Sequence, residues 1–538
     1  MTWPSLRYKY RSLARSQSGL WLLRSGCYFL PIAVAAVLGG LNAQQLFAAE
    51  PGTSGTNIEQ RVQELAPKLE EYVAGGMKAF DVPGVAIGIL VGDKLVYSKG
   101  YGVRSKGGPT VDPETIFQIG STTKAFLGTT IAIAVDRGKL HWDDRVVDLD
   151  PNFQLKDPWV TREFRVFDLI AQRSGLPPYV NDMLGILGFD ESAMIRSLRY
   201  AEPVSSFRAT FAYTNITHLI AGRVVAKTEG VANWNVVLRE ELLDPLGMKQ
   251  SSYTAEAIKA APNHAEGYRY TPDGSVEVPF EQLFPYDFGG AGDINSNIDD
   301  MAHWVRLQLG NGSFEGRPVV SPENLAVTRT PKVAVNDKMA YALGWVNAQT
   351  PNGNIVWHNG GTNGFGSYVG LQLDKNIGLI VLTNQSNVGF PDAIGTWTFD
   401  QLLSNSPVDH VAEALKRATT KYSDDNKMFA KPANPRPFPP VAPLTGSFTN
   451  SSFGNASLKQ EGGVLVLELK SGAQLKLEPW DGDIFTAQLV PTGRFAPVAE
   501  NLGPRPSGFV QFQMDKEGKL NLLRLSFDDG QAYEFRRE

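Results

Sequence analysis

The chain has 538 residues, of which 42% are hydrophobic and 20% are charged, and its formal net charge is −5. This composition excludes a disordered chain, and the length predicts more than one domain. Because no large basic block follows the N-terminal leader, we expect no nucleic-acid partner.

Residues 1–49 have the features of an export signal. Basic residues precede an apolar run over 28–41, and small residues follow as far as Ala49. The run is short for a membrane span. We therefore expect cleavage and a mature protein that is periplasmic or extracellular, without a stable membrane span; an uncleaved N-terminal anchor is the alternative. Cleavage would remove Cys27, the one cysteine, and leave neither a disulfide nor a cysteine nucleophile.

The next elements alternate between helix and strand. Apolar residues over 58–80 have helical spacing, and residues 85–104 predict a hairpin that turns at Gly92. A short apolar strand then leads into a helix that is expected over 121–137. The middle third of the chain is rich in helical patterns.

Ser121 and Lys124 form an S-x-x-K pattern at the start of that helix. Their side chains share one helix face, about 5–6 Å apart at Cβ. A serine hydroxyl needs a neighbour that takes its proton, and a lysine can do so where its surroundings disfavour the ammonium form. Free N–H groups at a helix start suit an oxyanion. The pattern predicts an acylatable serine, but it is short enough to occur by chance.

Two further elements follow in the chain. Tyr213 and Asn215 form a Y-x-N triplet. A phenol beside a lysine ammonium is expected to be held toward phenolate and to act as a base. An amide offers a donor and an acceptor to a substrate amide. Tyr213 alone could equally be a core aromatic residue.

The second element is a glycine-rich turn that contains His358, Gly360 and Gly361. The glycines allow close approach of the backbone to a substrate, and the N–H of Gly361 can complete an oxyanion hole with that of Ser121. Residues 354–384 around this turn carry strand signals. Alone, His358 could be a hydrogen-bonded structural residue, but the three elements in this order make chance a poor explanation.

The segregation of helices and strands predicts an α+β sandwich with a helical lobe and a cleft between them. The six histidines are scattered, without the spacing of metal ligands. We expect no metal and no cofactor, because acyl-enzyme chemistry requires neither.

A change of composition marks the C-terminal part. Six prolines crowd between 432 and 443, and we expect residues 406–443 to form a stiff linker. Residues 444–538 contain short alternating strands separated by turn signals, which predicts a small antiparallel barrel or sandwich.

Residues 58–405 resemble the class C β-lactamase-like branch of the serine β-lactamase and penicillin-binding protein superfamily. This branch includes D,D-peptidases, D-aminopeptidases and family VIII-type esterases. The motifs at Ser121, Tyr213 and His358 carry the resemblance. Residues 169–177, 245–248, 289–292 with Ser296, and 341–345 are similar to further landmarks of the family.

The resemblance implies a serine β-lactamase/transpeptidase-like sandwich, with an antiparallel sheet flanked by helices, followed by a lipocalin-like barrel in residues 444–538. It implies that Ser121 is the nucleophile, Lys124 the co-base and Tyr213 the second proton-transfer group. It places Asn215 against the substrate. It also implies that His358-Asn-Gly360 takes the position of K-T-G and that Gly361 is the oxyanion-hole residue.

One departure from the family pattern concerns His358, where class C β-lactamases have lysine. Because imidazole is mostly neutral at pH 7, we expect a substrate carboxylate to be held less firmly, and more firmly as the pH falls. We therefore expect a serine hydrolase that acts on ester, amide or peptide substrates, including small molecules and peptidoglycan-type peptides. The alternatives are a penicillin-binding D,D-peptidase or peptidoglycan-binding protein with little turnover, and a true class C β-lactamase.

Overall fold

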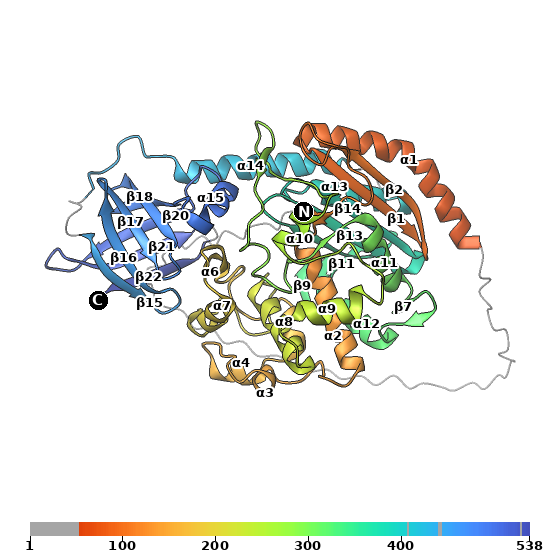
Figure 1. Cartoon of the computed structure of the whole chain (residues 1–538), viewed down its shortest axis with the longest axis horizontal. Helices are drawn as coiled ribbons and strands as arrows, with labels where there is room; N and C mark the ends of the chain where they lie inside the picture. The colour runs from red at the N-terminus through yellow and green to blue at the C-terminus, as the bar shows by residue number, and fades with distance from the viewer. Residues whose placement is uncertain (1–52, 406–407, 439–443, 528–529) are drawn as a thin grey trace, which may run out of the picture.

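The computed structural model describes residues 53–405, 408–438, 444–527 and 530–538. The predicted export signal, with Cys27, lies outside the described residues. In the described ranges, no helix is both long enough and apolar enough to cross a bilayer. Figure 1 shows a larger domain of helices and sheet and a smaller barrel, with helix α14 (His410–Phe429) running between them.

An antiparallel sheet of eight strands lies at the centre of the larger domain. The hairpin predicted near Gly92 is present as β1 and β2, and β1 also pairs with β14 from the far end of the domain. The strand order is β2 (Lys94–Gly102), β1 (Gly84–Val91), β14 (Ile377–Thr383), β13 (Gly366–Gln372), β12 (Gly353–Gly361), β11 (Val346–Thr350), β10 (Met339–Tyr341) and β9 (Val333–Asn336).

Helices cover both faces of this sheet. On one face lie α1 (Thr53–Phe80) and α13 (Phe390–Leu403), and on the other lie α2 (Thr123–Asp136) and α11 (Ile298–Leu309). Successive side chains of β1 alternate between the two cores, so that the whole strand is buried and apolar. This arrangement confirms the predicted α+β sandwich.

A helical lobe packs beside α2. Most of its helices are short, since polar turns and prolines interrupt the helical patterns. Besides α2 and α11, the helices between the hairpin and β9 are α3 (Val146–Leu149), α4 (Pro158–Glu163), α5 (Val166–Ile170), α6 (Asp182–Ile186), α7 (Glu191–Ser197), α8 (Ile216–Glu229), α9 (Trp234–Leu238), α10 (Ala255–Ala260) and α12 (Pro322–Arg329). Three two-stranded sheets pair β3 (Phe117–Gln118) with β6 (Asn295–Ser296), β4 (Gly267–Arg269) with β5 (Val276–Val278), and β7 (Ser313–Phe314) with β8 (Arg317–Pro318).

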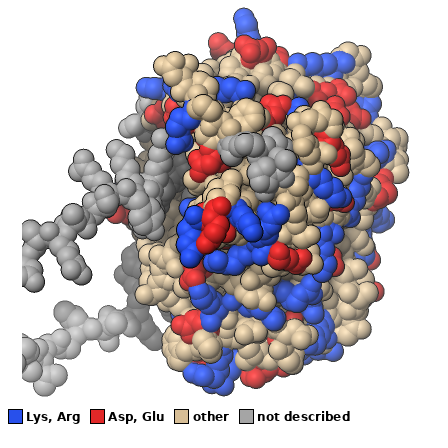
Figure 2. All heavy atoms as spheres, turned by 90° about the vertical axis from the view of Figure 1, so that its left-hand side faces the viewer, with Lys and Arg blue, Asp and Glu red and all other residues tan. Residues whose placement is uncertain are grey.

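The C-terminal domain is a closed antiparallel barrel of eight strands. Its strands are β15 (Gly446–Asn450), β16 (Gly454–Glu461), β17 (Val464–Leu469), β18 (Gln474–Asp481), β19 (Ile484–Leu489), β20 (Gly508–Met514), β21 (Leu520–Phe527) and β22 (Ala532–Arg537). Pairing of β15 with β22 closes the barrel, which removes free sheet edges. A short helix, α15 (Ala496–Leu502), separates β19 from β20. Figure 2 shows basic and acidic side chains interspersed over this end of the molecule.

The predicted linker over 406–443 is wrong for much of its length, because α14 occupies half of it. The buried residues Val411, Ala414 and Ala418 recur at helical spacing and pack against α1 and α13. The prolines begin only after the helix ends. The proline-rich composition of residues 432–443 therefore concealed a helix that belongs to the packed domain.

Candidate active site

Ser121 lies where strand β3 gives way to helix α2. It occupies a 3₁₀ turn over Gly120–Thr122, and α2 begins at Thr123. Gly120 has a φ of 51°, in the left-handed region that favours glycine. Backbone N–H groups in a first helical turn have no intrahelical acceptor. Because Ser121 is partly exposed, a substrate can reach its hydroxyl.

Lys124 is buried one turn further along the helix. Its Nζ lies 3.0 Å from Ser121 Oγ, 2.8 Å from Asn215 Oδ1 and 2.7 Å from the backbone oxygen of Ala291. Burial lowers the pKa of Lys124 to about 7, although the charges of Asp182 and Asp293 act in the opposite direction. A large fraction of this amine is therefore neutral near pH 7.

The partners of Lys124 also direct its lone pair. The oxygens of Ala291 and Asn215 can only accept hydrogen bonds, so each accepts one from an N–H of Lys124 Nζ. A neutral amine has only two protons, and its lone pair then points at the third partner, the Ser121 hydroxyl. This is the arrangement that a general base needs.

Tyr213 lies in the same cluster but in a different protonation state from the one expected. Its ring is buried, with Lys124 Nζ 4.8 Å from the ring centroid, and its hydroxyl hydrogen-bonds to Ser121. Burial raises the pKa of Tyr213 well above its usual value. The expected phenolate is therefore wrong: desolvation, with smaller contributions from Tyr341, Tyr179 and Asp182, outweighs the hydrogen bond of Ser121 and favours the neutral phenol.

Asn215 connects the lysine to a buried carboxylate. Its Oδ1 accepts from Lys124, and its Nδ2 donates to Asp182 Oδ2 at 2.6 Å. A carboxylate can only accept, so Asn215 must direct its Nδ2 at Asp182 and its Oδ1 at Lys124. Asn215 was expected to contact substrate. One of its N–H groups is instead committed to Asp182, which the sequence motifs did not identify.

The turn after β12 approaches Ser121 through two glycines. A Cβ on Gly360 would lie 1.8 Å from the backbone oxygen of Ile119, so only glycine allows this contact. Thr362 N donates to Phe365 O across the turn, and the alternation of antiparallel pairing then directs the N–H of Gly361 away from β13. The backbone nitrogen of Gly361 faces Gly120, beside Ser121.

His358 lies behind the cluster and does not reach the surface. Only 1% of the residue is exposed, its Nε2 lies 3.1 Å from Tyr341 Oη, and its Nδ1 lies 2.6 Å from the backbone oxygen of Asn359. Burial and the nearby Lys124 lower the pKa of His358 to about 3. The expectation that it gains charge at mildly acidic pH is therefore wrong, because a buried imidazole beside a lysine resists a proton.

The structure thus brings together the predicted residues of all three motifs. It adds residues that no motif marked, above all Asp182 and Asp293. Burial raises the pKa of Asp293 to about 7. The segment 289–292, noted only as a family landmark, supplies the Ala291 oxygen that binds Lys124. In the described chain, no group of histidine, cysteine, aspartate and glutamate side chains could hold a metal ion.

Comparisons with known proteins agree with this architecture. The family model described as Beta-lactamase matches residues 69–402, and the chain belongs to this family. A second model, a domain of unknown function (DUF3471), matches residues 430–537, which include the barrel.

Two relatives illustrate the range of the family. Unguisins hydrolase ungD' of Aspergillus campestris is 27% identical over 84% of this chain and 89% of its own length. Penicillin-binding protein 4 of Amycolatopsis lactamdurans is 26% identical over 68% of this chain and 93% of its own. The solved structure of the octameric penicillin-binding protein homologue from Pyrococcus abyssi covers 88% of this chain and all of its own, with a TM-score of 0.57 and 22% identity, and shows the same fold.

Proposed function

We propose that this member of the β-lactamase-fold hydrolase family is a serine hydrolase that works through an acyl-enzyme on Ser121. The observation that carries the proposal is the contact of 3.0 Å between Ser121 Oγ and Lys124 Nζ, in which two obligate acceptors direct the lysine lone pair at the hydroxyl. The lowered pKa of Lys124, about 7, supports its role as the base.

In the proposed acylation, Ser121 Oγ bonds to the substrate carbonyl carbon while its proton passes to Lys124. The N–H groups of Ser121 and Gly361 stabilise the oxyanion. When the carbon–oxygen or carbon–nitrogen bond breaks, Tyr213 gives its phenolic proton to the leaving group, and the Lys124 ammonium restores that proton. In deacylation Lys124 takes a proton from water, whose oxygen attacks the acyl carbon. The Lys124 ammonium then gives this proton to Ser121 Oγ as the bond between Oγ and the acyl carbon breaks.

We infer that the substrates are esters, amides or peptides, both small molecules and peptidoglycan-type chains. The hydrolase name of the ungD' relative supports turnover of a substrate. The neutral, buried His358 offers no permanent cation for a carboxylate, which argues against efficient β-lactam hydrolysis. We also propose that the protein is exported, on the basis of its N-terminal sequence.

The second candidate function is a penicillin-binding D,D-peptidase that acylates and turns over little. The similarity to Penicillin-binding protein 4 over 93% of that protein favours it. The two candidates differ in deacylation. A burst of product without steady turnover on D-alanyl peptides would identify the second candidate.

The test combines covalent labelling with a substrate panel. A fluorophosphonate should add one mass to the peptide that contains Ser121, and Ser121→Ala should abolish labelling and lower kcat by at least about 10⁴-fold. Ser105→Ala, outside the cluster, is the matched control and should behave as wild type. The panel contains p-nitrophenyl esters, D-alanyl peptides and a chromogenic cephalosporin. Labelling of another serine, or full activity in Ser121→Ala, would overturn the proposal.

A further inference from the structure

The C-terminal domain forms buried hydrogen bonds with two segments of the larger domain that adjoin the active site. Its last strand, β22, carries Tyr533, whose Oη donates to Asn181 Oδ1 at 2.9 Å. Its helix α15 carries Asn501, whose Nδ2 donates to Glu281 Oε1 at 3.0 Å. Both contacts are buried, so water does not compete for these partners.

The first contact leads to Lys124. Asn181 precedes α6 and has a φ of 58°, a left-handed conformation that is uncommon outside glycine. Such a conformation persists where the surroundings hold it. Tyr533 from the barrel and Ser197, whose Oγ lies 2.6 Å from Asn181 Nδ2, supply that support.

The residue after Asn181 is Asp182, which accepts from Asn215, which in turn accepts from Lys124. The conformation of Asn181 determines where the Asp182 carboxylate lies. The barrel is thus linked, through a chain of hydrogen bonds and one peptide unit, to the charge that faces Lys124.

The second contact leads to the oxyanion side. Glu281 Oε1 also accepts from Asn363 Nδ2 at 2.8 Å, and Asn363 lies in the turn two residues after Gly361. Glu281 is only 3% exposed. One buried carboxyl oxygen therefore joins the barrel helix to the turn that carries the proposed oxyanion donor.

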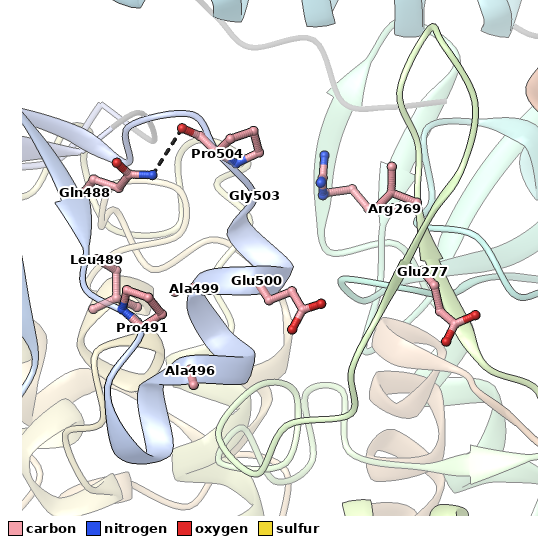
Figure 3. Close-up of a pocket in the computed structure, with 11 residues that line it drawn as sticks. Arg269, Glu277, Gln488, Leu489, Pro491, Ala496, Ala499, Glu500, Gly503 and Pro504 are labelled. Atoms are coloured by element: carbon pink, nitrogen blue, oxygen red, sulfur yellow. Dashed lines mark hydrogen bonds between the residues drawn. The ribbon is translucent and has the colours of Figure 1, made fainter.

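A pocket opens between the two domains close to the second contact. Beside Asn501, α15 and the β4–β5 hairpin enclose a cavity of about 460 Å³. Figure 3 shows Arg269 and Glu277 on the hairpin side and Glu500 and Gly503 on the α15 side. The guanidinium of Arg269 lies against Gly503, so that a Cβ on this glycine would be 2.9 Å from Arg269 Cζ. The buried hydrogen bond of Asn501 adds a directional contact to this face.

We propose that the barrel is a working part of the active site, in which Tyr533 positions the Asp182–Asn215–Lys124 chain and Asn501 positions the turn that bears Gly361. This inference rests on the proposed function, since it assigns the two residues to the same acylation step. Each is a positioning residue, because neither touches the reacting atoms.

The two contacts predict different kinetic signatures. Tyr533→Phe removes only the hydroxyl and frees Asn181, so that Asp182 shifts away from Lys124. Because the charge of Asp182 raises the pKa of Lys124, the acid limb of the rate of Ser121 acylation should move to lower pH. The titratable groups that surround Lys124 are Asp182, Asp293, Tyr213, His218 and His358. Asn501→Leu should instead lower the plateau rate above the Lys124 limb about tenfold, through a misplaced oxyanion donor. Burial raises the pKa of Glu281, the partner of Asn501, to about 7, so the comparison is made on this plateau.

The control removes a contact between the domains that leads elsewhere. Arg505 of the barrel, four residues after Asn501, forms an ion pair of 3.3 Å with Asp425 of α14, a helix that carries neither of the two links. Arg505→Gln should leave the pH profile and the rate unchanged. All variants should keep a melting temperature within about 2 °C of wild type, since even a small shift corresponds to a substantial loss of stability in a chain of this size.

The measurement is the rate of fluorophosphonate labelling of full-length protein from pH 5.5 to 9. If the wild type is not labelled at Ser121, the proposed function fails. If it is labelled but Tyr533→Phe keeps the acid limb in place and Asn501→Leu keeps the rate, only the positioning role is overturned. Losses that disappear when the variants are assayed further below their melting temperatures would also overturn it, because they would reflect stability alone.

Discussion

Lys124 stands near the midpoint of its titration at neutral pH. Burial favours the neutral amine, while Asp182 and Asp293 favour the ammonium, and the balance places the pKa at about 7. A base with this pKa is active in the range where most hydrolases work. The protonation equilibrium of the proposed base is therefore set by its surroundings before any substrate arrives.

This balance predicts the pH dependence of acylation. A lowered lysine pKa means that the competent neutral form is present above about pH 7 and is lost as the pH falls below that value. We expect kcat/KM for a neutral ester to rise with pH through about 7 and then to reach a plateau. The rise should follow the titration curve of a single group, the Lys124 amine. Stopped-flow acylation from pH 5.5 to 9 measures it.

Two variants test whether Lys124 or His358 is the group whose ionisation causes the rise of kcat/KM with pH, which forms the acid limb of the profile. Lys124→Arg keeps a permanent cation and should lose acylation at every pH. His358→Gln should leave the limb near pH 7, since His358 has a pKa of about 3 and does not titrate in this range. A limb that disappears in His358→Gln would assign it to the imidazole and contradict our assignment.

The sequence alone could predict which motifs meet, but not their protonation states. The S-x-x-K and Y-x-N patterns place Ser121, Lys124, Tyr213 and Asn215 in one group, and the structure brings them within contact. Asp182 could not be predicted, because it belongs to no pattern and approaches Asn215 only through the tertiary fold. The states of Tyr213 and His358 depend on burial, which no local pattern encodes.

At the scale of elements, strand β12 and the turn before α2 set the geometry of the candidate oxyanion hole. The strand ends against the backbone of Ile119, and Ser367 on β13 donates to the same oxygen at 2.6 Å. Thr122 Oγ1 lies 2.8 Å from Ser367 Oγ and holds the other side of the turn. These contacts hold Gly361 against Gly120, the residue before Ser121.

Gly360→Ala tests this packing. Its Cβ would lie 1.8 Å from the Ile119 oxygen and 2.5 Å from Ser367 Oγ, so the strand must move away from Ser121. We expect a loss of about 1–3 kcal/mol in the free energy of unfolding and at least tenfold in kcat. Urea unfolding and ester kinetics measure the two effects.

Gly361→Ala is the matched control. Its Cβ would meet only Asn387 Cβ, at 3.2 Å, and alanine keeps the backbone N–H. Its kcat should stay within a few-fold of wild type, within the cost of a small local shift. Equal damage from the two substitutions would show that the close approach of Gly360 is not what positions the strand.

Helix α14 shows where prediction from composition fails at this scale. Its buried positions are mostly alanine, which gives a weak apolar signal, and the prolines that follow dominate the local composition. The helix is held by contacts with α1 and α13. One of them is a hydrogen bond of 2.9 Å from the backbone N–H of Val411 to the side-chain Oη of Tyr72 on α1. Such contacts with distant segments are not visible in a local window.

At the scale of the whole molecule, barrel closure was only partly predictable. The apolar alternation of β17, β18, β20 and β21 is clear in the sequence, whereas β15 and β22 are short and polar on one side. Their pairing joins the two ends of the domain. A closed barrel depends on this contact between distant segments, and strand patterns alone could not distinguish it from a sandwich.

The cores of the barrel and the helical lobe form one continuous apolar cluster. Phe453 at the barrel end packs edge-on against Phe189 of the lobe, with ring centroids 5.4 Å apart, and also contacts Tyr533. We therefore expect one cooperative thermal transition for the protein, with activity lost in the same transition. Calorimetry and residual ester hydrolysis, followed on the same samples, measure both.

Phe453→Ala removes the shared aromatic contact. Only 1% of Phe453 is exposed, and the substitution should cost about 3–5 kcal/mol, through lost transfer free energy and the cavity it leaves. If the domains are coupled, the midpoint of the single transition falls and ester hydrolysis is lost at the same lower temperature. Met514→Ala, at a partly exposed position of the barrel, is the control and should leave the midpoint nearly unchanged. The contrary outcome is a barrel that melts first while the larger domain stays active up to the wild-type temperature. The two cores would then be independent, since unfolding of a barrel that supports the active site would also reduce activity.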